Sequence, residues 1–280
     1  MDHDFSSWVG RQETRADTLA PARADALNMA LGGAPPLAAG TPLPPLFHWL
    51  YFWDVRAPVG LGVDGHPARG GFLPPVPLPR RMWAGGRLWF DRPLLVGAAV
   101  TRTSTIRTVE AKSGRSGDLV FVTVAHEIAD DRGVAVREEQ DIVYRGEAAP
   151  GSMKSPDLSA PPPVAPWREE VTPDPVLLFR YSALTMNGHR IHYDRPYTRD
   201  VEAYPALVVH GPLQATLLMQ LATRSLPAPV TRFEFRGQAP AFDGATLHIC
   251  GEPAGSGAKL WTAQGAGTCM VAMASVGAPA

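Results

Sequence analysis

The sequence predicts an α+β fold in which two similar halves each wrap an antiparallel sheet around one helix. Three observations predict it: a helical segment followed by strand-like runs, the same order of elements in the second half, and a proline-rich stretch between them. Hydrophobic residues make up 45% and charged residues 19% of the 280 residues, a composition that can bury a core. No sequence repeat links the halves, so the duplication rests on element order alone.

The prolines indicate where the chain divides. Residues 151–175 hold seven prolines and no hydrophobic periodicity, which is typical of an extended connector. We therefore expect an N-terminal domain at 1–150, a connector at 151–175 and a C-terminal domain at 176–280, both domains being of ordinary size.

In the first half, residues 17–31 have helical spacing of Leu19, Ala22, Ala26 and Met29, and a glycine pair follows as a stop. Runs rich in β-branched residues or with alternating character then predict strands at 98–109, 119–124 and 133–144. The turn residues Asp130–Gly133 join the last two as a hairpin.

In the second half, residues 212–224 predict a long helix, because Pro212 suits a first helical position and leucines recur on one face. Before it, 176–181 reads as a strand. After it, alternating or apolar runs predict strands at 231–236, 246–251, 259–264 and 268–275.

Composition excludes several classes of protein. The net charge of -1 gives no global reason to bind nucleic acid or an anionic membrane. Two cysteines are too few for a disulfide framework or a four-thiolate zinc site. The first residues are acidic and polar, unlike a secretory signal, and no apolar run approaches the roughly 20 residues of a membrane span. We expect a cytoplasmic globular protein.

The richest polar segment is 181–194, which contains Asn187, His189, Arg190, His192 and Asp194. Polar groups gathered this closely must be solvated or bonded to one another, and apolar neighbours indicate that the segment is partly buried. A solvated surface loop would also fit the composition. We favour a functional loop, because loops on rigid scaffolds often carry active-site residues.

A second candidate is the start of the long helix, His210-Gly211-Pro212. Glycine allows a ligand close to the backbone, and a helix N-terminus presents unpaired N–H groups with positive dipole character. Since proline has no N–H, Gly211 supplies the exposed donor, which suits an oxygen that gains negative charge. A turn that merely begins a helix would look the same.

The third candidate is the segment 78–87, which holds Arg80, Arg81 and Arg87 beside Trp83 and a glycine pair. Arginines next to an apolar wall suit an anionic ligand. A surface turn held by ion pairs would fit equally well.

Two motif matches are not supported by their context. Residues 60–65 satisfy G-x-G-x-x-G, but no helix is predicted after them, so a dinucleotide fold is not indicated. His189, His192 and Asp194 have the residue types of metal ligands, but their predicted loop provides no helical face and no cysteine or further carboxylate lies near. We expect no metal.

Residues 181–194, followed by 204–213, resemble the MaoC-like, (R)-specific acyl-CoA hydratases. They are most similar to the double-hotdog branch that includes mesaconyl-CoA (3-methylfumaryl-CoA) hydratase, itaconyl-CoA hydratase and 3-hydroxyacyl-thioester dehydratase. Residues 8–11, 78–86 and 117–124 resemble the N-terminal domain of that branch. The resemblance implies a double hotdog with its active site in the C-terminal half, where that half meets the N-terminal one.

The resemblance also implies roles for residues. His192 matches the catalytic histidine of the family, whereas Asn187 stands where the wider family has an aspartate. An amide is no base near neutral pH, although it can orient a water molecule. The implied mechanism places that water between Asn187 and His192, with His192 taking its proton and returning one to the α-carbon, and with the Gly211 N–H stabilising the thioester oxygen.

Further residues receive binding or orienting roles on the same basis. Arg80, Arg81 or Arg190 would bind a free substrate carboxylate, and the choice among them stays open. Asp194 would orient the loop or the imidazole. Tyr193 and His210 complete the expected binding residues.

The expected function is reversible hydration of a branched dicarboxylic enoyl-CoA, mesaconyl-CoA or itaconyl-CoA to citramalyl-CoA, by a hydro-lyase without cofactor, acting as a homodimer. The alternative within this chemistry is a general (3R)-hydroxyacyl-thioester dehydratase. Because hotdog folds also host thioesterases, fold alone does not fix the reaction. A non-catalytic acyl-CoA-binding module is the alternative of a different class, and Asn187 is its main support.

Overall fold

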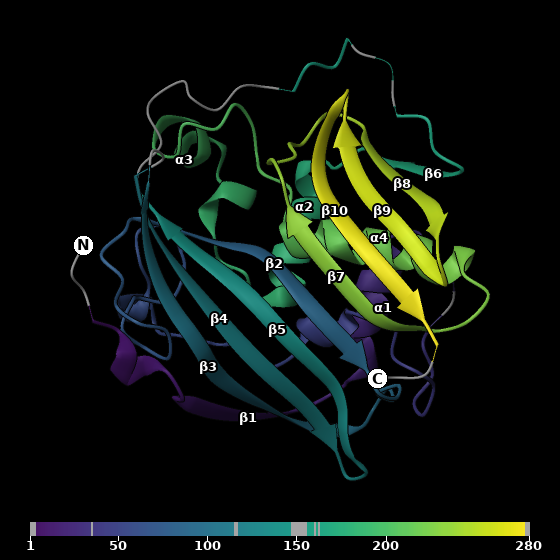
Figure 1. Cartoon of the computed structure of the whole chain (residues 1–280), viewed down its shortest axis with the longest axis horizontal. Helices are drawn as coiled ribbons and strands as arrows, with labels where there is room; N and C mark the ends of the chain where they lie inside the picture. Colours follow the sequence, from purple (N-terminus) through teal and green to yellow (C-terminus); the bar gives the residue numbers. More distant parts are fainter. Residues whose placement is uncertain are drawn as a thin grey trace.

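The computed structural model describes residues 4–34, 36–114, 117–146, 156–159, 161 and 163–277. Ten strands form one antiparallel sheet (Figure 1): β1 (Gln12–Thr18), β2 (Arg80–Phe90), β3 (Ala99–Gly114), β4 (Gly117–Asp130), β5 (Gly133–Arg145), β6 (Trp167–Val171), β7 (Val230–Gly237), β8 (Leu247–Ala254), β9 (Gly257–Gln264) and β10 (Gly267–Val276). The α-helices are α1 (Pro21–Ala30), α2 (Pro175–Thr185), α3 (Arg195–Asp200) and α4 (Gly211–Ser225).

The two halves of the chain join edge to edge. The strand order is β1-β3-β4-β5-β2-β7-β10-β9-β8-β6, so the first five positions come from the N-terminal half and the last five from the rest. At the joint, β2 pairs with β7 from Gly85↔Arg236 to Trp89↔Arg232. A Cβ on Gly85 would lie 2.6 Å from the carbonyl oxygen of Phe235, so glycine is required for this close approach.

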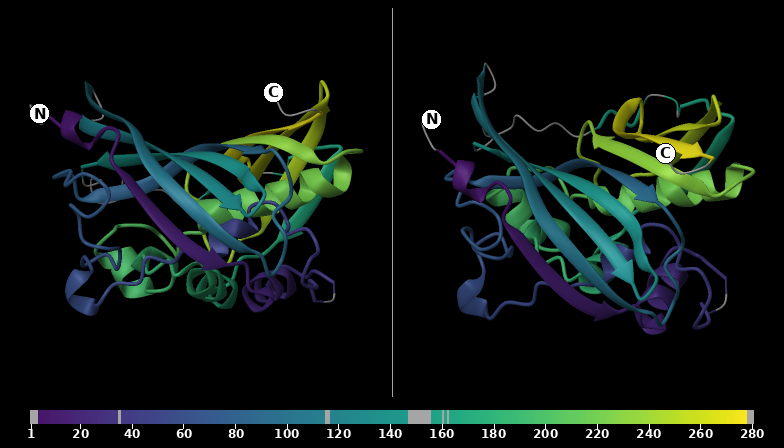
Figure 2. Two further views of the ribbon diagram at one scale, coloured as in Figure 1. Left: turned by 90° about the horizontal axis from the view of Figure 1, so that it is seen from below. Right: turned by 60° about the horizontal axis from the view of Figure 1, so that its bottom comes forward.

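The sheet arches over the helices, as Figure 2 shows. The longest helix, α4, packs against the C-terminal strands β7 to β10, with Leu213, Leu218 and Leu221 buried. Each fully buried leucine contributes about 1.5–3 kcal/mol relative to exposure. The predicted helix at 212–224 is confirmed to within a residue at each end.

The N-terminal helix is shorter than the sequence predicts. Residues 17 and 18 end β1, which pairs with β3, and α1 begins only at Pro21. This helix packs against α2 and against the short turn Phe47–Leu50. The long helix inside a sheet is therefore a feature of the C-terminal half.

The prediction of a strand at 176–181 is wrong, because these residues lie in α2. The Asp174 carboxylate accepts a hydrogen bond from the Leu177 N–H at 2.7 Å, and Pro175 occupies the first turn. An aspartate cap followed by proline is a helix start, and this signal outweighs the local strand propensity of the apolar residues that follow.

The other predicted strands lie within strands of the structure, and the hairpin at Asp130–Gly133 joins β4 to β5. The predicted connector 151–175 lies partly outside the described residues. Its last part forms β6, which pairs with β8 at the sheet edge.

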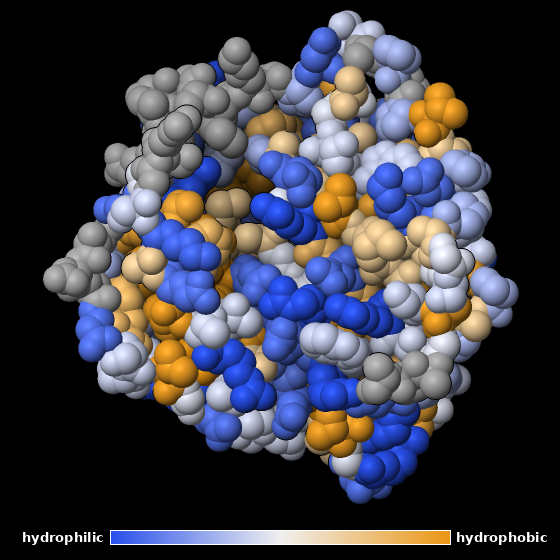
Figure 3. Space-filling model, viewed as in Figure 1, coloured by the Kyte–Doolittle hydropathy of each residue, from blue (hydrophilic) through white to orange (hydrophobic). Residues whose placement is uncertain are grey.

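The face of the sheet that points away from the helices is largely hydrophilic over its middle (Figure 3). On β2, Arg87 forms ion pairs with Glu139 and Asp141 of β5, each at 2.8 Å. Among the described residues, no helix is both long enough and apolar enough to cross a membrane.

Candidate active site

The polar loop follows α2 directly. Met186 ends this helix in the left-handed conformation (φ 52°), and the Asn187 N–H donates to the Ser182 carbonyl. The Asn187 Oδ1 accepts a hydrogen bond from the backbone N–H of His189 at 3.0 Å. The amide of Asn187 therefore shapes the loop, while its NH₂ group stays available to a water molecule.

His192 is a buried, neutral base. Its Nδ1 lies 2.7 Å from the carbonyl oxygen of Val208. Because a carbonyl only accepts hydrogen bonds, Nδ1 carries the proton and Nε2 keeps its lone pair. Burial lowers the pKa of His192 to about 3, and the charge of His189 is the second cause of this shift. The imidazole is thus unprotonated near neutral pH and its Nε2 can accept a proton.

His210 brings the start of α4 against His192. Their rings stack with centroids 3.6 Å apart, and the His210 Nε2 lies 2.8 Å from the Ser182 Oγ. His210 is fully buried and caps α4, so Gly211 begins the helix next to the stacked rings. A Cβ on Gly211 would meet the nearest neighbouring atom at 3.8 Å, so packing alone does not demand glycine. The base therefore stacks on the residue that directly precedes Gly211.

The side chains of Arg190, Tyr193 and Asp194 stabilise the loop. Arg190 binds the Asp194 carboxylate at 2.7 Å and lies 4.0 Å over the ring of Tyr197. Asp194 caps α3 by accepting from the Tyr197 N–H, and the Tyr193 hydroxyl donates to the Gly188 carbonyl at 2.8 Å. Arg190 is therefore already paired with a carboxylate.

A loop of the N-terminal half, which no sequence pattern marked as functional, packs against the polar loop. The Arg190 N–H donates to the Asp64 carbonyl at 2.9 Å. Gly65 adopts a φ of 87°, and a side chain there would collide with the Gly188 carbonyl. The Asp64 carboxylate receives the His66 Nδ1 at 3.1 Å, and the His66 ring lies 4.2 Å from that of His189.

Asp64, His66 and His189 each offer an atom within 4.8 Å of the others, a spacing that a metal ion would also require. The Asp64 and His66 atoms already share a hydrogen bond. Burial lowers the pKa of both His66 and His189, and the positive charge of Arg81 lowers it further.

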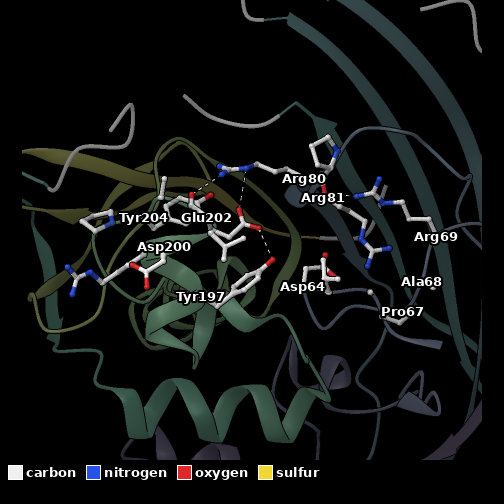
Figure 4. A pocket seen from close by; sticks show the side chains of 17 residues that line it. Asp64, Pro67, Ala68, Arg69, Arg80, Arg81, Tyr197, Asp200, Glu202 and Tyr204 are labelled. Carbon is white, nitrogen blue, oxygen red and sulfur yellow. Dashed lines mark hydrogen bonds and ion pairs between the residues drawn. The ribbon is translucent and has the colours of Figure 1, made fainter. Parts of the chain in front are cut away.

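A cavity of about 780 Å³ lies beside the N-terminal loop that contains Asp64. Its walls include Asp64, Arg69, Arg80, Arg81, Tyr197 and Glu202 (Figure 4). Arg80 donates to the Glu202 carbonyl at 2.8 Å and forms an ion pair with its carboxylate. Among the described residues, Arg81 forms no ion pair with a carboxylate. Of the three candidate arginines, Arg81 is thus the unpaired cation at the cavity.

The signal for this loop was present in the sequence. Asp64-Gly65-His66 includes the last glycine of the G-x-G-x-x-G match, which does not indicate a dinucleotide fold because no helix is predicted after it. Its importance comes from a contact with residues 187–194, more than a hundred positions away, which no local pattern encodes.

Comparisons with known proteins show the family of the chain. The family model of hydroxyacyl-thioester dehydratase type 2 matches residues 46–243. The chain is 50% identical to mesaconyl-C(4)-CoA hydratase of Chloroflexus aurantiacus, with 90% of each chain covered. It is 30% identical to the mitochondrial hydroxyacyl-thioester dehydratase type 2 of Schizosaccharomyces pombe, over 88% of this chain and 90% of that one.

Solved structures support the fold. HtdX of Mycobacterium tuberculosis has a TM-score of 0.66 at 18% identity, covering 95% of this chain and 99% of that one. A second Mycobacterium tuberculosis protein, described as a double hotdog, has a TM-score of 0.55 at 16% identity and covers 95% of both chains. The predicted α+β double hotdog is confirmed. From the extent of these matches, the chain belongs to the hydroxyacyl-thioester dehydratase type 2 family.

Proposed function

We propose that this protein is a hydro-lyase that reversibly hydrates a branched C5 dicarboxylic enoyl-CoA, mesaconyl-CoA or itaconyl-CoA, to citramalyl-CoA. The observation that carries the proposal is the neutral His192 base stacked beside the start of α4. The extensive identity with a mesaconyl-C(4)-CoA hydratase supports the choice of substrate class.

The proposed chemistry uses groups of this chain only. His192 Nε2 takes a proton from a water molecule, which the Asn187 NH₂ helps to orient, as the oxygen attacks the β-carbon. Negative charge develops on the thioester oxygen, and the Gly211 N–H at the positive end of α4 stabilises it. Since addition of water transfers no electrons to a carrier, we propose that the reaction needs no cofactor.

We propose that Arg81 binds the free carboxylate of the substrate. It lines the cavity, it has no carboxylate partner among the described residues, and its charge reaches the histidines of the site. Arg80 is held by Glu202 and Arg190 by Asp194, so both are already neutralised. A guanidinium without a partner gains most from a bidentate carboxylate.

A substrate panel tests both proposals. Purified wild-type protein should hydrate mesaconyl-CoA or itaconyl-CoA with a higher kcat/KM than crotonyl-CoA, measured by loss of enone absorbance. Arg81→Met should lower kcat/KM for the dicarboxylic substrates by about 10²-fold, the loss of a charge-assisted pair, and change crotonyl-CoA turnover little. Arg137→Met, which removes an exposed arginine paired with Asp91, is the matched control.

The same panel separates the alternatives. A general (3R)-hydroxyacyl-thioester dehydratase, which the more distant relative's name favours, would act on crotonyl-CoA at least as well. A thioesterase would release free thiol, which a thiol dye reports. An acyl-CoA-binding module would bind the thioester stoichiometrically without turnover.

We further propose a cytoplasmic homodimer. Cys250 and Cys269 are both buried and unpaired, so neither forms a disulfide, which fits a reducing compartment. Homodimerisation is tested by light scattering of the purified protein, and a monomeric mass would contradict it.

A further inference from the structure

Hydration moves two protons, and the family resemblance assigns both transfers to His192. His192 accepts the proton of the attacking water, and the α-carbon must gain one. The wider hydratase family has an aspartate where this chain has Asn187, whereas the double-hotdog branch that the loop resembles shares the asparagine. An amide has no proton to exchange near neutral pH.

His189 lies where a second proton-transfer group is needed. Its ring centroid is 5.5 Å from that of His192, and the ring planes are nearly perpendicular at 87°. The α- and β-carbons of an enoyl thioester are directly bonded, so two groups that serve them must lie this close together. Asn187 fixes the backbone of His189 through its Oδ1.

Asp64 supplies the charge that a protonated His189 requires. His66 holds both carboxylate oxygens of Asp64, one by its backbone N–H at 3.0 Å and the other by Nδ1 at 3.1 Å. The carboxylate and a His189 ring nitrogen lie within 4.8 Å of each other.

We propose that His189 is the second acid/base of the site, and that Asp64, clamped by His66, is a positioning residue that stabilises the protonated form of His189. The inference rests on the proposed hydratase function. It adds a residue of the N-terminal half to the chemistry of the C-terminal half.

The proton and bond changes balance. In hydration, a water O–H bond breaks, its proton goes to His192 Nε2, and the oxygen bonds to the β-carbon. The electron pair of the double bond moves onto the thioester oxygen as an enolate. His192 then passes its proton to His189, which gives it to the α-carbon as the carbonyl re-forms, so both rings end neutral. Dehydration runs the same steps in reverse.

The charges around His189 make a prediction about Asp64. Burial lowers the pKa of His189 to about 3, the charges of His66, Arg81 and His210 act in the same direction, and the Asp64 carboxylate raises it. The ring is therefore neutral near pH 7 and holds a proton only during the reaction. Removing the carboxylate by Asp64→Asn should destabilise that protonated form and lower kcat, with KM little changed.

The experiment compares His189→Gln and Asp64→Asn with wild type, with His248→Gln and Asp118→Asn as controls distant in sequence. His189→Gln should reduce kcat by about 10²–10³-fold, which is the usual contribution of a general acid or base to the rate, with KM little changed. The isotope effect for dehydration of α-deuterated hydroxyacyl-CoA should rise, because proton transfer at the α-carbon becomes slower. Added imidazole should partly restore kcat to His189→Ala.

Three results would overturn the inference. One is a His189→Gln enzyme with wild-type kcat and isotope effect, as expected if His192 alone carries both protons. Another is an Asp64→Asn enzyme with the kcat and isotope effect of wild type. The third is a divalent metal retained in one copy per chain and lost, together with activity, in Asp64→Asn. A wild-type protein that hydrates no thioester contradicts the proposed function instead, so the two failures are distinguishable.

Discussion

Each half of the molecule buries polar groups beside histidines, but Glu138 of the N-terminal half is paired more completely than His192 of the C-terminal half. In the N-terminal half, the Glu138 carboxylate is 2% exposed and receives His48 Nε2 at 3.1 Å and Trp49 Nε1 at 2.9 Å. In the C-terminal half, only one nitrogen of His192 is bonded, and the Nδ1 of the buried His210 has no partner among the described residues.

The difference separates a stabilising cluster from a reactive one. A buried carboxylate that several donors hold has no reason to exchange protons, and it fixes the packing of the segments around it. A buried imidazole with a free lone pair can take a proton as soon as a substrate brings one. Both clusters are rich in polar residues, so composition does not distinguish them, whereas the hydrogen-bond partners do.

The largest expected effect comes from removing the C-terminal base, His192. His192→Ala should lower hydration by about 10²–10⁴-fold, because it removes the base that takes the proton of the attacking water. Its unfolding midpoint in urea should stay within the range of ordinary core variants. Turnover near that of wild type would remove His192 from the mechanism.

Removing the N-terminal carboxylate should lower stability and leave the turnover of the folded protein largely unchanged. Glu138→Ala leaves His48 and Trp49 buried without their acceptor and should cost about 3–5 kcal/mol in free energy of unfolding. The matched control is Glu139→Ala on the same strand, a half-buried surface pair with Arg87 worth about 0.2–1 kcal/mol. If the folded Glu138→Ala protein lost turnover by orders of magnitude, the N-terminal cluster would not be purely structural.

The pH dependence of stability sharpens the comparison further. Burial lowers the pKa of His192 to about 3 and that of His126 to about 4, against 6.5 for an ordinary histidine. The unfolded chain therefore binds these protons first, so stability is present above about pH 6.5 and is lost as pH falls toward the folded values. Each histidine should contribute a slope of about 1.4 kcal/mol per pH unit in that window.

The measurement is urea unfolding at several pH values between neutrality and pH 5. His192→Gln and His126→Gln should each remove one histidine's share of the slope. A slope that neither variant changes would mean that both rings are protonated in the folded protein.

The smallest expected effect is that of Asn187→Asp. A carboxylate oxygen can accept the His189 N–H as the amide does, so the loop should keep its shape. Loss of the NH₂ donor to water should change kcat/KM by less than about tenfold, which corresponds to about 1.4 kcal/mol. A drop of several orders of magnitude would show that the amide donor is essential.

The parts of the fold that local pattern determines were predictable. The helix at α4 and the strands β7 to β10 follow from leucine spacing and alternation, because each element buries one face. The strand prediction at 176–181 failed since apolar residues alone do not distinguish a short helix from a strand, and the Asp174 cap was overlooked. Residues 17 and 18 were assigned to a helix because their partner strand β3 is distant in sequence.

The candidate site was likewise predictable from the sequence only in part. His192, Asn187 and Gly211 could be named because they lie in two short segments with a family resemblance. Asp64 and His66 could not, since their role depends on a tertiary contact that forms only where Gly65 passes Gly188. The sequence also could not show which arginines form ion pairs, because their carboxylate partners come near only when the chain folds.

The pairing of β2 with β7 has a consequence for synthesis on the ribosome. About 140 residues separate the end of β2 from the start of β7, so the first half emerges with one edge of its sheet still open. An open edge is a template for pairing with other chains. We expect the nascent protein to depend on chaperones during this interval, and variants that slow its completion to aggregate before they lose any activity per folded molecule.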